Sequence, residues 1–97
     1  MLKINKDTHR IKDIKYYDTC NYDERPNHIV IDTIIIHCIS LPYGEYDNNN
    51  IVDLFLNKLD ISKHESFSDL SNLRVSSYLL ISRKGDISQF VPFNLRA

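Results

Sequence analysis

The sequence predicts a small mixed α/β domain, of the α+β type, with a central mixed sheet flanked by helices. Three features indicate this fold: an apolar β-branched run that ends on His37, a helical apolar pattern over residues 51–58, and two apolar runs around the turn "RKGD". A chain of 97 residues suits one domain with a marginal core. Its net charge of −1 gives no general attraction to nucleic acid or to an anionic membrane, so neither is expected as a partner.

The first expected element is a strand over residues 33–38, within the run "HIVIDTIIIHCI" of residues 28–39. Its apolar residues are continuous rather than alternating, which predicts a strand buried on both faces. The strand ends on His37 and opens into a loop over residues 40–50. A histidine in this position is either a metal-binding or catalytic residue or, more often, a structural residue with a hydrogen-bond partner.

Two helices are expected after this loop. Asn50 is a candidate N-cap for a helix over residues 51–58, where the apolar side chains follow helical spacing. A second, short helix is expected from Ser66 to about Leu73, with Asp69 in the capping-box position. These two helices are all that the sequence predicts to cover the sheet.

The last expected element is a β-hairpin with strands over residues 78–82 and 87–91. Gly85 can adopt the positive φ that a tight turn requires, and Pro92 ends the second strand because it cannot donate a ladder hydrogen bond. Three strands and two short helices are few elements for a sheet with a strand buried on both faces. The pattern therefore predicts that some of the elements that cover the sheet are missing from these residues.

The candidate functional residues of the chain are His37, Cys38 and Arg74. Cys38 could be a nucleophile beside His37, but adjacent strand residues point to opposite faces, which favours a buried apolar cysteine. Arg74 follows a predicted helix, where it could bind an anion or pair with the helix C-terminus. No other histidine lies at the close spacing that is typical of a metal site.

The sequence favours a cytoplasmic location. The start "MLKINKDTHRIKDIK" lacks the apolar stretch of a signal peptide, and the longest aliphatic run, residues 34–36, is too short to span a bilayer. Cys20 and Cys38 form neither a C-x-x-C pair nor a dense framework, as is common in a reducing compartment.

Four stretches of the chain, in order, resemble the type-2 N-acetylmuramoyl-L-alanine amidase family. The most specific is "IIIHCISLPYGEY" (34–46), which resembles the zinc-site strand and loop V-V-H-N-I-S-L-P-P-G-E-F. The others are "CNYDERP" (20–26), "IVDLFLNKLDISKHESF" (51–67) and "LRVSSYLLISRKGDISQFVPFNLRA" (73–97). Residues 20–97 are therefore identified as the N-terminal half of an amidase domain, also related to peptidoglycan-recognition folds, and residues 1–19 as an N-terminal extension.

The resemblance implies a zinc hydrolase that cleaves the amide between (anhydro-)N-acetylmuramic acid and L-alanine in muropeptides, as in peptidoglycan recycling. His37 matches the first of the family's two histidine and one aspartate ligands, so Zn²⁺ is the expected cofactor. Arg74 matches a substrate-contacting arginine, and Cys38 replaces the asparagine that usually follows the ligand. Arg74 and Cys38 are assigned to substrate binding, while Tyr78 replaces a usual histidine.

The resemblance also implies that this chain is incomplete as an enzyme. The family continues with a general acid/base glutamate, a lysine and two further ligands, none of which has a match in residues 1–97. The chain alone is expected to be weakly active or inactive and to leave apolar sheet surface exposed, and a complementary C-terminal half chain is the partner this implies. Two alternatives stay open: a non-catalytic muropeptide-binding module, and the remnant or split half of a decayed amidase.

Overall fold

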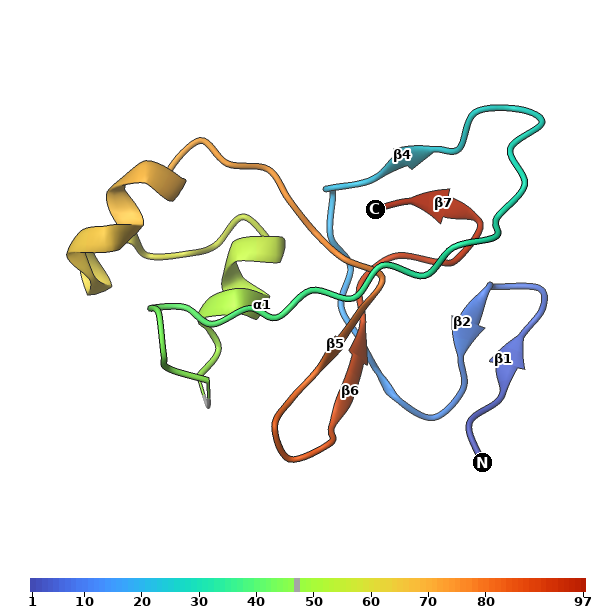
Figure 1. The fold of residues 1–97 in the computed structure, drawn as a ribbon, viewed down its shortest axis with the longest axis horizontal. Helices are drawn as coiled ribbons and strands as arrows, with labels where there is room; N and C mark the ends of the chain where they lie inside the picture. The colour runs from blue at the N-terminus through green and yellow to red at the C-terminus, as the bar shows by residue number, and fades with distance from the viewer. Residues whose placement is uncertain (47) are drawn as a thin grey trace.

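The computed structural model describes residues 1–46 and 48–97, so Asp47 of the predicted 40–50 loop lies outside the described residues. Figure 1 shows short strands around the centre and helices gathered at one end. The strands are β1 (Ile4–Asn5), β2 (Arg10–Ile11), β3 (Lys15–Tyr16), β4 (Asp23–Glu24), β5 (Leu79–Ile81), β6 (Ile87–Gln89) and β7 (Leu95–Arg96). The helices are α1 (Asn50–Phe55) and the 3₁₀ helices η1 (Ile61–Lys63) and η2 (Glu65–Leu70).

A mixed sheet of order β3-β6-β5 forms the centre of the fold and confirms the predicted fold class. β5 and β6 pair antiparallel with Leu80 opposite Ser88, which confirms the predicted hairpin. Gly85 takes the positive φ of 89° that the turn requires. β3 adds to the other side of β6 in parallel, with Lys15 opposite Ser88, and this strand was not predicted.

The predicted strand over residues 33–38 is wrong, because the structure assigns no strand to residues 25–78 among those it describes. Ile34, Ile35 and Ile36 are exposed rather than buried on both faces. The physical reason is that a strand needs a paired neighbour and a covering layer, and in the described residues this segment has neither. Figure 1 shows it as an extended trace that crosses the face of the molecule.

The helix predicted over residues 51–58 forms as α1, but it spans Asn50–Phe55, so it ends three residues before the predicted end and its cap also differs. Asn49 is the N-cap and makes no capping hydrogen bond, while the Asn50 side chain donates to the Leu41 carbonyl at 3.0 Å. The second predicted helix is the 3₁₀ helix η2. Its N-cap is His64, whose Nδ1 accepts a hydrogen bond from the Ser66 amide at 3.1 Å, so the predicted capping box beginning at Ser66 is wrong.

The core lies between α1 and the end of β6. It consists of buried apolar residues whose rings and side chains contact one another: Ile51, Leu54, Phe55, Phe90 and Val91. Phe90 is fully buried, with its ring centroid 5.2 Å from that of Tyr17 and 5.1 Å from that of Phe55. This one aromatic side chain therefore links β6 to the helix and to the segment that follows β3.

Residues 1–19 are tied to the sheet through the buried side chain of Gln89. Its Oε1 accepts from the Ile11 amide at 2.8 Å, and its Nε2 donates to the carbonyls of Val91 and His9 at 2.9 and 3.2 Å. The Phe93 amide also donates to the His9 carbonyl at 3.0 Å. The N-terminal segment is thus packed against the body, while a domain boundary at residue 19 stays a prediction.

Among the helices that the structure describes, none has the length and apolar character needed to traverse a lipid bilayer.

Candidate functional site

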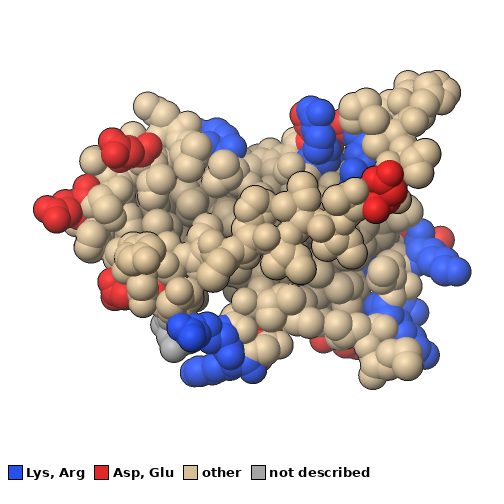
Figure 2. All heavy atoms as spheres, in the orientation of Figure 1, with Lys and Arg blue, Asp and Glu red and all other residues tan. Residues whose placement is uncertain are grey.

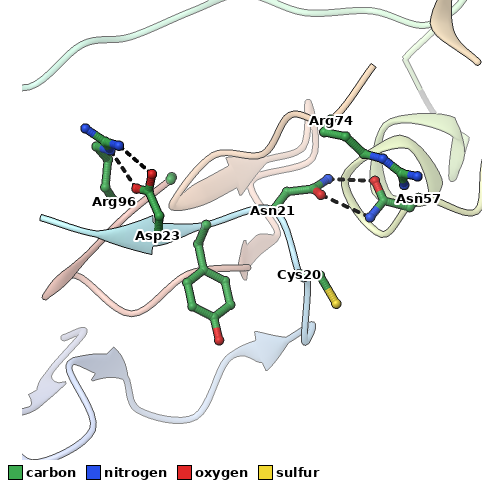
Figure 3. A pocket seen from close by; sticks show the side chains of 8 residues that line it. Cys20, Asn21, Asp23, Asn57, Arg74 and Arg96 are labelled. Atoms are coloured by element: carbon green, nitrogen blue, oxygen red, sulfur yellow. Dashed lines mark hydrogen bonds and ion pairs between the residues drawn. The ribbon is translucent and has the colours of Figure 1, made fainter. Parts of the chain in front are cut away.

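An open pocket of about 610 Å³ lies where β4, the end of α1 and the C-terminal strand meet. Figure 3 shows two groups of side chains around it, Asp23 with Arg96 on one side and Asn21 with Asn57 and Arg74 on the other. Its lining residues are Cys20, Asn21, Tyr22, Asp23, Asn57, Arg74, Arg96 and Ala97. Amides, two guanidiniums, a carboxylate and a thiol surround one space, which makes the pocket suited to a polar ligand.

One wall of the pocket is fixed by the pairing of β4 with β7. The antiparallel register places Asp23 directly opposite Arg96. Arg96 Nε donates to Asp23 Oδ1 at 2.6 Å, and a second guanidinium nitrogen contacts the other carboxylate oxygen. These hydrogen bonds hold the pKa of the Asp23 carboxyl below its ordinary value, so this wall carries a closed ion pair at neutral pH.

The opposite wall is fixed by two asparagines whose side-chain amides bond to each other. Asn21 Nδ2 donates to Asn57 Oδ1 at 2.8 Å, and Asn57 Nδ2 donates back at 3.0 Å. Asn21 Nδ2 also reaches the carbonyls of Phe55 and Val75, at 3.1 and 2.8 Å. Asn57 follows α1 with a positive φ of 61°, a conformation that asparagine tolerates better than most residues. This clasp holds the segment before β4 against the end of α1.

Arg74 enters the pocket beside this clasp, as Figure 3 shows. Its side chain is exposed, and within the described part of the chain it makes no hydrogen bond or ion pair. Arg96, by contrast, is engaged by Asp23. Arg74 is therefore the pocket's available cation, and its planar guanidinium can bind a carboxylate through two parallel hydrogen bonds.

The structure places the other two predicted site residues apart from this pocket. His37 and Cys38 are exposed in the extended trace and are not among the pocket-lining residues. The described residues also contain no group of three histidine, cysteine, aspartate or glutamate side chains that could hold a metal ion. A catalytic zinc needs about three protein ligands, so the residues present do not by themselves fit Zn²⁺.

Tyr78, at the position where the resembled family has a histidine, has a structural role here. Its hydroxyl donates to the Leu95 carbonyl at 2.6 Å and accepts from the Arg25 guanidinium. Arg25 Nε in turn donates to the Phe93 carbonyl at 3.2 Å. The tyrosine thus fastens the segment after β4 to the C-terminal residues and so stabilises the pocket wall.

Of the pocket residues, the sequence identified Arg74 alone as a functional candidate. It missed Asn21, Asn57 and Arg96, whose convergence depends on contacts between distant parts of the chain. One signal was available, since the stretch "CNYDERP" of residues 20–26 resembles the opening motif of the amidase family and includes the pocket residues up to Asp23.

Sequence comparison identifies relatives that share one name. The chain is 38% identical over 87 residues to the 1,6-anhydro-N-acetylmuramyl-L-alanine amidase AmpD of Haemophilus influenzae, which covers 90% of this chain and 47% of that protein. It is 42% identical over 77 residues to AmpD of Escherichia coli, covering 79% of this chain and 42% of that protein. The chain thus spans about half the length of the curated relatives it matches, and no family model matches it.

Structural comparison gives the same result. A crystal structure of a selenomethionine AmpD derivative superposes with a TM-score of 0.90 at 34% sequence identity. The superposition covers 98% of this chain and 52% of the other. These findings confirm the resemblance to the amidases and the α+β fold class, and they apply to about half of the relatives' length.

Proposed function

We propose that this chain, a homologue of the AmpD amidases over about half of their length, supplies one half of an amidase site that acts on muropeptides in peptidoglycan recycling. The observation that carries the proposal is the superposition on AmpD over 98% of the chain with a TM-score of 0.90. Fold alone does not imply function, but sequence identity of 34% in the same superposition supports a shared site.

Arg74 and Cys38 are proposed to contact the substrate. Muropeptides carry carboxylates, and Arg74 offers an exposed guanidinium in a pocket lined by amides. Cys38 adjoins His37 and presents an exposed thiol where the family usually has asparagine. Both assignments rest on the resemblance together with the exposure of these side chains.

Zn²⁺ is proposed as the cofactor of the complete domain, with His37 as one of its ligands. Support comes from the match of His37 to the family's first ligand and from its exposure, which leaves the imidazole accessible. Because the described residues offer no group of three ligands, the remaining ligands must come from the complementary half of the domain. Residues 1–97 alone are therefore proposed to be weakly active or inactive.

A cytoplasmic location is also part of the proposal. Cys20 and Cys38 are both free and exposed among the described residues, as expected for thiols in a reducing compartment.

Activity is expected only when both halves are present. In this experiment the chain is produced in the same cells as the half of the E. coli relative that the resemblance places after Ala97, and the purified 1:1 complex is termed the assembled domain. Peptide release from 1,6-anhydro-N-acetylmuramyl-tripeptide is measured with zinc present. The assembled domain is expected to release peptide at least about 10²-fold faster than the chain alone, because the chain lacks a general acid/base.

The control is the E. coli half produced without the chain, which is expected to be inactive. Equal rates for the chain alone and the assembled domain would contradict the proposed inactivity of the chain. An assembled domain of confirmed 1:1 stoichiometry that releases no peptide would contradict the amidase proposal. Saturable binding of the tripeptide to such an inactive complex would favour the muropeptide-binding module instead.

A further inference from the structure

The N-terminal hairpin of β1 and β2 belongs to a basic segment that the proposed amidase site does not use. Residues 1–15 contain five lysine or arginine side chains and two aspartates, although the whole chain has a net charge of −1. Figure 2 shows basic side chains at the edge of the molecule where Figure 1 places these two strands. A local excess of positive charge attracts anions even when the protein as a whole is nearly neutral.

The strand register places two lysines of this segment side by side. Asn5 lies opposite Arg10 in the antiparallel pair. The Lys12 amide donates to the Lys3 carbonyl at 2.7 Å, which extends the same register toward the start of the chain. Directly opposed residues of an antiparallel pair share a face, so Lys3 and Lys12 project from the hairpin together. Arg10 lies two positions before Lys12 on this same face, and the three residues are here termed the basic face.

No ion pair neutralises the basic face within the part of the chain that the structure describes. The ion pair found there joins Asp23 to Arg96, in the amidase pocket. The two aspartates near the hairpin form none: Asp7 lies in its turn, where its amide donates to the Asn5 side chain, and Asp13 follows β2 with a positive φ of 65°. Like charges directly opposite each other destabilise a strand pair, and a bound anion would remove this repulsion.

Arg10 is partly buried and is held against an aromatic ring. Its guanidinium carbon lies 3.6 Å from the centroid of the Tyr16 ring, which limits the motion of the group and fixes its charge beside the hairpin. Its Nε atom is buried and has no hydrogen-bond partner among the described residues. Burial of a charged donor without a partner is costly, and a negative charge bound at the basic face offsets part of that cost.

We propose that Lys3, Arg10 and Lys12 form a binding site for a phosphate group. Lysine ammoniums are compact charges that can approach a tetrahedral phosphate from different directions, whereas a planar carboxylate is matched best by the fork of a free arginine. Arg10 contributes positive potential rather than a free fork, because its guanidinium lies on Tyr16. A soluble phosphorylated compound and the headgroup of an anionic lipid both carry this group. The site is separate from the amidase pocket, so its failure would leave the proposed function intact.

The test is titration of the chain with inorganic pyrophosphate at low ionic strength, followed by calorimetry and by the amide resonances of residues 3–12. Saturable binding is expected. The double substitution Lys3→Gln with Lys12→Gln is expected to raise the dissociation constant about tenfold or more, because it removes both ammoniums and keeps the backbone pairing. The matched control is Lys58→Gln with Lys63→Gln, which removes the same charge from exposed lysines beside α1 and in η1 and is expected to leave the constant within about twofold.

Phosphatidylcholine vesicles that contain phosphatidylglycerol, compared with pure phosphatidylcholine vesicles, identify the source of the phosphate. Binding of pyrophosphate that is lost in the double variant of the basic face supports a soluble phosphorylated ligand. Binding to the phosphatidylglycerol vesicles alone, with the same loss, supports a lipid headgroup. The proposal is overturned if neither probe binds, if the two double variants weaken binding equally, or if citrate binds as tightly as pyrophosphate. Far-ultraviolet circular dichroism of each variant shows whether the fold is retained.

Discussion

The substitution His37→Ala is expected to lower peptide release by the assembled domain by about 10³-fold or more. His37 is the one residue of the chain that matches a metal ligand of the amidases, and it is exposed near the end of the apolar run of residues 28–39. Polarisation by a bound metal contributes several kcal/mol to lowering a hydrolytic barrier, and each 1.36 kcal/mol is a factor of ten in rate. Peptide release and zinc content are both measured, so a lost ligand is distinguished from a misplaced substrate.

The matched control is His28→Asn, at an exposed histidine near the other end of the same stretch. His28 has a positive φ of 66°, which asparagine tolerates, so the substitution adds little strain. The control is expected to retain zinc and most of the activity. If His37→Ala retained both zinc and activity, His37 would not be a ligand and the resemblance at this position would have no functional meaning.

The substitution Phe90→Ala is expected to destabilise the chain by about 3–5 kcal/mol, the usual cost of removing a buried aromatic side chain. Phe90 is fully buried and contacts the rings of both Tyr17 and Phe55, so its loss leaves a cavity between α1 and β6. A domain of this size is stable by only about 5–15 kcal/mol. We therefore expect a large fall in the urea midpoint, measured by circular dichroism, or complete unfolding at 37 °C.

Tyr22→Ala serves as the comparison, because Tyr22 is 49% exposed on the pocket wall. Its effect on the urea midpoint is expected to be several-fold smaller than that of Phe90→Ala. Similar midpoints for the Phe90→Ala variant and the unchanged chain would show that the contacts between α1 and β6 do not hold the fold together.

Elements determined by local sequence were predicted correctly. The hairpin of β5 and β6 follows from two apolar runs around a turn with Gly85, and α1 follows from the spacing of its apolar residues. Both depend on neighbours within a few positions along the chain. The cap of α1 was misplaced by one residue because Asn48, Asn49 and Asn50 are chemically equivalent candidates.

The strand predicted over residues 33–38 was wrong because the segment lacks a paired neighbour. Its composition is that of a buried strand, but pairing and burial require another strand and another layer. Within the described residues the position beside β6 is occupied by β3, which comes from a polar stretch that gave no strand signal. In the described residues the 33–38 segment has neither a paired strand nor a covering layer, so it remains unpaired and exposed.

The candidate site was predicted in part. Arg74 lies in the pocket as a free guanidinium, but His37 and Cys38 lie elsewhere on the surface. The asparagine clasp could not be inferred from the sequence, because Asn21 and Asn57 are 36 residues apart and meet only where the segment before β4 lies against the end of α1. Contacts between residues so far apart in the chain produce no recognisable pattern in the local sequence.

The central claim is that residues 1–97 hold one part of a metal site that the complementary half completes. Native mass spectrometry tests it most directly, since one spectrum reports both chain stoichiometry and bound zinc. The expected result is a 1:1 complex of the chain with the E. coli half that carries one zinc ion, and a free chain that carries none at equimolar metal. A free chain or a dimer of this chain that retains one zinc ion per protomer under the same conditions would contradict the claim.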